Sequence, residues 1–187
     1  LTAMLNIQRE EFVQVPQRKL AFADMALPIG HDQSMMKPVI EGRMLQALSL
    51  KPTDSVLEIG TGSAYVTALL SCLADNVHSI DLYQDFTEAA KQKLQEHQID
   101  NVRLENADFY TFKPSQKYDR IVITGSVTEV PAEVFNWLNT DGQVFAIVGN
   151  DPIMEARMYQ SPAVYSSHFD TVVGKLIKKD EPHTFKL

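Results

Sequence analysis

A glycine-rich turn followed by a carboxylate is the part of this sequence best suited to chemistry. Residues 56–70 read VLEIGTGSAYVTALL, so a G-T-G-S turn lies between an apolar strand and an apolar helix. Glycines there let the backbone turn tightly and approach a ligand closely. Asp81 ends the next predicted strand, where a carboxylate can accept both hydroxyls of a ribose. The pattern predicts a nucleoside site, and it leaves open a structural turn without a ligand.

The spacing of the glycines indicates a ligand without phosphates. The pyrophosphate fingerprint G-x-G-x-x-G/A is broken at Tyr65, and a Walker lysine is absent. The form E-x-G-x-G-S resembles motif I of class I S-adenosylmethionine-dependent methyltransferases. That resemblance implies cofactor contacts from Glu58, Gly60, Thr61, Gly62, Ser63, Asp81 and Leu82. A dinucleotide-dependent oxidoreductase is the alternative, and binding of NAD without binding of S-adenosylmethionine would support it.

Two further strand ends fit the same ligand. Asp108 and Phe109 follow the third predicted strand. In methyltransferases with this motif, an acidic residue here meets the exocyclic amine of adenine and an apolar neighbour stacks on the ring. A helix N-cap is the alternative role of Asp108. Thr124 and Gly125 end the fourth strand, beside the expected position of methyl transfer.

These residues need a parallel sheet to bring them together, and the hydrophobic pattern predicts one. Short apolar runs alternate with helical segments from residue 55 onward, which is typical of a doubly wound, mostly parallel α/β sheet. The predicted strands are 55–60, 76–81, 101–106, 118–125 and 143–149, and the predicted helices are 63–75, 84–97 and 131–138, with a turn at Asp141-Gly142. Ligands of such sheets bind at the carboxyl ends of the strands.

The two ends of the chain depart from this alternation. The prediction there is a helix over 1–13, an irregular arm over 14–38, a helix starting at Pro38, and antiparallel edge strands at 156–161 and 167–174. We therefore expect one Rossmann-like methyltransferase domain over 1–187. It divides into an N-terminal helical arm (1–50), a cofactor-binding core (51–150) and C-terminal strands (151–187).

Longer segments resemble one family within the methyltransferases. LPIGHDQSMMKP, VLEIGTGSAYVTALL, YDRIVITGSVTEVP and DGQVFAIVG are similar to protein-L-isoaspartate O-methyltransferases, over roughly residues 10–150. The resemblance implies S-adenosyl-L-methionine as cofactor. It also implies protein repair, in which a methyl group is transferred to a carboxylate of isoaspartyl residues in damaged proteins.

The loop of residues 30–38, GHDQSMMKP, departs from that family. Its members usually read G-x-G-Q-T-I-S-x-P, and the resemblance implies that the loop serine lies close to the reacting carboxylate. Gln33, Ser34 and Met35 match the glutamine, threonine and isoleucine, whereas Met36 occupies the serine position. Three interpretations remain open: slower methylation of isoaspartate, a different small or apolar acceptor, and a noncatalytic cofactor-binding module.

The expected reaction places few demands on the pocket. Methyl transfer from a sulfonium is an in-line displacement, so the enzyme mainly holds the nucleophile close and aligned. A carboxylate with a pKa of about 4 is ionised at neutral pH and needs no general base. Ser34 and Met36 are the candidate catalytic residues, and His31, Gln33, Met35 and Glu41 the candidate pocket residues. No histidine and carboxylate spacing indicates a metal.

The composition of the chain limits the kinds of molecule that it is expected to bind. The formal net charge is −7, which argues against a nucleic-acid backbone as partner. The single cysteine, Cys72, sits at helical spacing from Leu69 and Leu73, so we expect it to be buried. No signal peptide or membrane-spanning run is evident, and the default is a cytoplasmic protein. The sequence does not indicate an oligomeric state.

Overall fold

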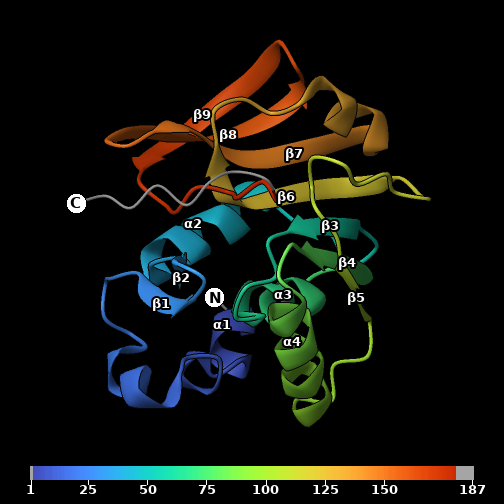
Figure 1. The fold of residues 1–187 in the computed structure, drawn as a ribbon. Coiled ribbons are helices and arrows are strands. Elements are labelled where there is room, and N and C mark those ends of the chain that lie inside the picture. Colours follow the sequence, from blue (N-terminus) through green and yellow to red (C-terminus); the bar gives the residue numbers. More distant parts are fainter. Residues whose placement is uncertain (1, 180–187) are drawn as a thin grey trace.

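The predicted alternation of strands and helices builds one central sheet. The computed structural model describes residues 2–179, and its seven-stranded sheet has the order β5-β4-β3-β6-β7-β8-β9 (Figure 1). Neighbours from β5 to β7 run parallel, whereas β8 runs antiparallel to both of its neighbours, β7 and β9. The strands are β3 (Ser55–Ile59), β4 (Asn76–Asp81), β5 (Val102–Asn106), β6 (Tyr118–Val127), β7 (Leu138–Asn150), β8 (Ile153–Ser161) and β9 (Val164–Thr171). The predicted fold class and antiparallel edge are confirmed.

Alternating side chains bury both faces of the sheet. In β3, Val56 joins the cluster that packs under α2 (Pro38–Leu48) and α3 (Tyr65–Ser71), and Leu57 joins the cluster on the opposite face. α4 (Gln84–Glu96) packs beside α3 through Ala90 and Leu94. This alternation is expected for strands covered on both faces.

Within residues 2–179 the opposite face is covered without an α-helix, which corrects the prediction for residues 131–138. That segment is a 3₁₀ helix, η3 (Ala132–Trp137), and β7 starts directly after it at Leu138. Because β7 begins immediately after Trp137, the six residues of η3 cannot extend into a longer helix. The predicted turn at Asp141-Gly142 is also wrong: β7 runs through it with a positive φ of 63° at Asp141, beside a register shift against β6.

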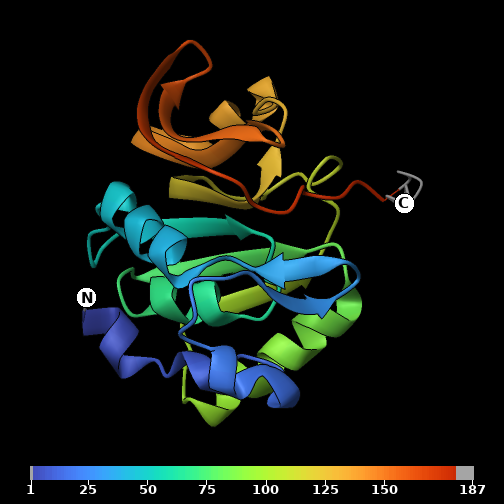
Figure 2. The ribbon, with the colours of Figure 1, turned by 90° about the vertical axis from the view of Figure 1, so that its left-hand side faces the viewer.

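The N-terminal arm is more ordered than its sequence suggests. The helix predicted for 1–13 ends early, as α1 (Thr2–Asn6), and short 3₁₀ helices follow at η1 (Arg9–Glu11) and η2 (Val15–Leu20). The predicted irregular segment contains a hairpin of β1 (Leu27–Gly30) and β2 (Gln33–Met35). Positive φ angles at Gly30, His31 and Asp32 make its tight turn. In Figure 2 this hairpin overlaps the centre of the sheet.

Two predictions near helix and strand ends also need correction. Cys72 is exposed rather than buried, because α3 ends at Ser71 and Cys72 follows its last turn. β9 ends at Thr171, and residues 172–177, here called the C-terminal strap, turn back toward β6. The Ser126 N–H donates to the Gly174 carbonyl at 2.8 Å, and the Leu176 N–H donates to the Ser126 carbonyl at 2.9 Å.

Candidate active site

The glycine-rich turn and the carboxylate after β4 are joined directly. One oxygen of Asp81 accepts the Gly62 N–H at 2.9 Å, and the other accepts the Tyr83 N–H at 2.9 Å. The Gly60 N–H donates to the Ile80 carbonyl at 2.8 Å. Burial raises the pKa of Asp81, and the two backbone N–H groups act in the opposite direction. The predicted pairing of the turn with an acidic strand end is therefore present.

Only glycine fits at the start of this turn. Gly60 has a φ of 99°, and a Cβ there would lie 2.3 Å from the hydroxyl oxygen of Thr124. That hydroxyl donates to the carbonyls of Ile59 and Gly60, each at 2.9 Å. Thr124 thus holds the backbone of the turn in place from within β6, which continues to Val127, beyond the predicted strand end at Gly125.

Glu58 links β3 to α3 and β4. Its side chain is fully buried and accepts hydrogen bonds from the hydroxyls of Thr67 and Ser79. It is not among the residues that line the cavity above the turn, so its position gives no support to the predicted cofactor contact. Burial raises the pKa of Glu58 to about 8, against the two hydroxyl donors.

We expect Glu58→Gln to remove a pH dependence of stability. The folded-state pKa of about 8 exceeds the ordinary value of 4.5, so the unfolded chain loses its proton first as pH rises. Between about pH 4.5 and 8 the free energy of unfolding of the wild type should fall relative to the variant, by up to about 1.4 kcal/mol per pH unit. Urea unfolding across this range measures the difference. Parallel pH curves for the two proteins would contradict the assignment.

A cavity opens at the carboxyl ends of β3, β4 and β6, and it unites two predicted groups of residues. The cofactor group contributes Gly60, Thr61, Gly62, Ser63, Asp81, Leu82, Phe109 and Thr124. The loop and helix after it contribute Gln33, Ser34, Met35, Met36 and Glu41. One continuous cavity can therefore hold a nucleoside at one end and a second reactant beside the loop.

Asp108 lies outside the lining of this cavity, although its neighbours Ala107 and Phe109 belong to it. A carboxylate oxygen of Asp108 accepts the Tyr110 N–H at 3.0 Å, and its carbonyl accepts the Thr111 N–H at 3.1 Å. The side chain therefore closes a turn, which resembles the capping alternative except that no α-helix follows. Its predicted contact with adenine remains a prediction.

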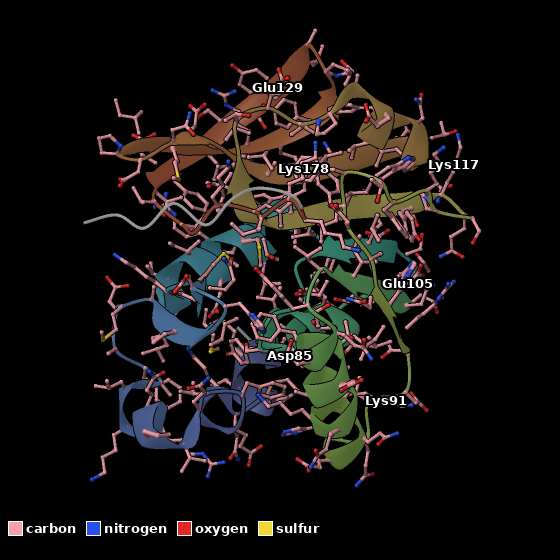
Figure 3. All side chains as sticks on the ribbon, in the orientation of Figure 1. Asp85, Lys91, Glu105, Lys117, Glu129 and Lys178 are labelled. Carbon is pink, nitrogen blue, oxygen red and sulfur yellow. The ribbon has the colours of Figure 1, made fainter. Side chains whose placement is uncertain are left out.

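His31 also lies outside the lining, at the tip of the β1–β2 hairpin. Its ring stacks on Tyr83 with centroids 3.9 Å apart, and its Nε2 lies 2.8 Å from a carboxylate oxygen of Asp85. Asp85 stands at the start of α4, where Figure 3 labels it. The hydrogen bond from His31 lowers the pKa of Asp85. His31 thus ties the hairpin to the segment after β4 rather than facing the cavity.

Arg9 is a site residue that the sequence analysis missed. Its guanidinium is 1% exposed and donates to the carbonyls of Ala21 and Met36, at 2.7 and 2.8 Å, and to the carboxylate of Glu41. Burial raises the pKa of Glu41 to about 7, against the lowering effect of Arg9. Arg9 thereby fixes the backbone of Met36 from the N-terminal arm. Nothing in the local sequence around Arg9 indicates this role.

The C-terminal strap forms another wall that was not predicted. Leu176 and Ile177 line the cavity together with Val172, Val173 and Gly174. A Cβ on Gly125 would lie 2.9 Å from the Leu176 nitrogen, so the absence of a side chain at this position of β6 allows the strap to approach. The available sequence signal was a glycine inside an otherwise apolar strand.

Sequence comparison decides the family. A sequence model of the protein-L-isoaspartate(D-aspartate) O-methyltransferase family matches residues 1–172. The chain belongs to this family. The protein-L-isoaspartate O-methyltransferase of Opitutus terrae is 37% identical over 150 residues, which are 80% of this chain and 64% of that protein. The enzyme of Rhodopseudomonas palustris is 36% identical over 150 residues, covering 80% of this chain and 69% of that protein. The chain thus spans just under two thirds of the length of the Opitutus relative.

Solved structures agree with the family on the fold. A Plasmodium falciparum structure, described as a protein-L-isoaspartate O-methyltransferase in complex with S-adenosyl-L-homocysteine, superposes with a TM-score of 0.82. The sequences are 18% identical, and the match covers 95% of this chain and 89% of that one. The predicted resemblance to protein-L-isoaspartate O-methyltransferases and the Rossmann-like fold are both confirmed.

Proposed function

We propose that this chain is an S-adenosyl-L-methionine-dependent O-methyltransferase that esterifies isoaspartyl carboxylates in damaged proteins. The observation that carries the proposal is the single cavity shared by the glycine-rich turn and the loop of residues 30–38. One end presents Asp81 and the backbone of Gly62, and the other end presents Gln33, Ser34 and Met36. Family membership supplies the reaction that such a two-part cavity serves.

The residues present suit this cofactor. The Asp81 carboxylate can accept hydrogen bonds from ribose hydroxyls while it holds the two backbone N–H groups. Phe109 offers an apolar surface for the adenine ring, and Gly60 and Gly62 line the cavity with backbone alone. When bound, S-adenosyl-L-methionine supplies an electrophilic methyl group.

The chain's own contribution to the reaction is positioning. An ionised carboxylate needs no general base, so the rate depends on holding it close to the methyl carbon and in line with the carbon–sulfur bond. We assign this task to the loop of residues 30–38, whose backbone Arg9 holds at the Met36 carbonyl. Gln33 and Ser34 supply polar groups from β2 to the same cavity.

The second candidate function is methylation of a different small or apolar acceptor. Met36 is 8% exposed and belongs to the same hydrophobic cluster as Met44, Met154 and Met158. Methionine side chains line adaptable apolar pockets, and Met36 replaces the hydroxyl of the family's serine. A noncatalytic cofactor-binding module is the remaining alternative, and it too would be expected to bind S-adenosyl-L-methionine.

The proposal extends to domain and partners. We propose a single methyltransferase domain, an isoaspartyl-containing protein or peptide as partner, no nucleic-acid partner, and the cytoplasm as compartment. In the part of the chain that the structure describes, no helix is long and apolar enough to cross a membrane. Within residues 2–179, no group of three or more His, Cys, Asp or Glu side chains could hold a metal ion.

Calorimetry followed by a transfer assay tests the proposed function. We expect S-adenosyl-L-methionine and S-adenosyl-L-homocysteine to bind, whereas NAD should not. Labelled S-adenosyl-L-methionine should then transfer its methyl group to an isoaspartyl peptide but not to the aspartyl peptide of the same sequence. Binding of the cofactor with transfer only to apolar small molecules would favour the second candidate, and binding of NAD alone would refute both.

A further inference from the structure

A second concavity adjoins the cavity and runs between α2 and the antiparallel edge of the sheet. Lys37 and Val172 belong to the walls of both, so the two hollows meet at these residues. We call the second concavity the edge groove. The residues that line it are Asp24, Lys37, Val39, Ile40, Arg43, Pro152, Ile153, Met154, Phe169, Asp170, Thr171 and Val172.

Exposed apolar side chains gather in the edge groove. Val39, Ile153 and Val172 are 52%, 80% and 47% exposed, although all three are large hydrophobic residues. Phe22 and Met25 are also exposed and lie within two residues of the groove residue Asp24, although they do not line the groove. Scattered single apolar residues are ordinary on a surface, but a contiguous group marks a place where another molecule binds.

The edge groove also presents charged side chains that have no ion-pair partner among the described residues. The Arg43 guanidinium lies over the ring of Phe169, 4.2 Å from its centroid. Among residues 2–179, neither Arg43 nor Lys37 forms an ion pair, and the same is true of Asp24 and Asp170. The two cations can bind a carboxylate, and the two carboxylates can accept peptide N–H groups.

We propose that the edge groove binds the polypeptide on one side of the residue whose carboxylate enters the cavity. This inference rests on the proposed function, because a damaged residue in a protein carries chain beyond it and that chain must leave the cavity. The groove begins at the shared wall of Lys37 and Val172, and it offers apolar surface at Ile153 and a cation at Arg43 of α2. The preferred flank therefore combines an apolar residue with an acidic one.

Two substrates distinguish an effect on binding in the edge groove from an effect on methyl transfer itself. The first is a single isoaspartyl residue blocked at both ends. The second is a heptapeptide in which leucine and glutamate flank the isoaspartyl residue. Arg43→Glu and Ile153→Asp should each raise the KM for the heptapeptide about tenfold or more, with kcat and the KM for the blocked residue unchanged. With glutamate replaced by lysine in the peptide, Arg43→Glu should bind better than the wild type.

Matched controls lie away from the edge groove. Lys91→Glu makes the same charge reversal on α4, which Figure 3 shows far from β8 and β9. Val164→Asp places a carboxylate on an exposed apolar position of β9 outside the groove. Both controls should keep the wild-type KM for the heptapeptide.

Each outcome bears on the inference. A heptapeptide KM that neither groove variant changes would overturn it while leaving the proposed function intact. Methylation of the heptapeptide but not of the blocked residue by the wild type would support it, since the flank would then be required. Methylation of neither substrate, despite cofactor binding, would refute the proposed function and the groove inference with it.

Discussion

Met36→Ser is expected to raise the rate of methyl transfer to an isoaspartyl peptide by roughly ten- to a hundredfold. A hydrogen bond to a charged group contributes about 1.5–3 kcal/mol, which converts to that range of rates. Arg9 holds the Met36 carbonyl at 2.8 Å, so the substitution changes the side chain on a backbone that stays in place. The serine hydroxyl would then face the carboxylate position in the cavity.

The gain in rate should come with a loss of stability. Met36 is 8% exposed within a hydrophobic cluster. Truncating a buried methionine lowers the free energy of unfolding by about 2–5 kcal/mol. Met158→Ser makes the same change in the same cluster from β8, outside the cavity lining. It should lower stability without a gain in rate. Steady-state transfer assays with both variants measure the difference, and a Met36→Ser rate no higher than that of the wild type would show that Met36 does not occupy the acceptor position.

Asp81→Asn is expected to weaken binding of S-adenosyl-L-methionine about a hundredfold. Both carboxylate oxygens accept backbone N–H groups, from Gly62 and Tyr83. An asparagine must turn its NH₂ group toward one of these donors, which leaves that N–H unsatisfied and distorts the turn. It also removes a charged acceptor for the ribose. A loss of about 3 kcal/mol corresponds to the stated change in Kd.

Calorimetry checks this prediction against a surface control. Asp100→Asn removes the same charge from an exposed position before β5 and should keep the wild-type Kd. Thermal unfolding of both variants separates weaker binding from loss of the fold. An Asp81→Asn protein that is folded and binds the cofactor as tightly as the wild type would place the nucleoside elsewhere.

The parts of the fold that could be predicted are those governed by local pattern. β3 and β4 are short apolar runs bounded by glycine or a carboxylate, so their carboxyl ends at Ile59 and Asp81 could be located from sequence alone. The β1–β2 hairpin was missed because its turn uses positive φ at His31 and Asp32, which are not glycines. A tight turn of this kind carries a weak sequence signal.

The parts of the site that could not be predicted depend on contacts between distant segments. Arg9 and Glu41 are 32 residues apart, and no periodicity indicates that an arginine in a polar arm is buried against α2. The C-terminal strap reaches the cavity by bonding to Ser126 in β6. Glu58 is a different case: its place in the motif predicts contact with the ligand, and its buried side chain accepts hydrogen bonds from Thr67 in α3 and Ser79 in β4.

The most direct test of the proposed function is mass spectrometry of an isoaspartyl peptide and its aspartyl twin after incubation with the protein and S-adenosyl-L-methionine. We expect one base-labile methyl ester on the isoaspartyl peptide, and none on the twin or in the absence of the protein. Neither peptide modified, although calorimetry shows that the cofactor binds, would contradict the assignment and identify Met36 as the mark of a changed acceptor or of a noncatalytic site.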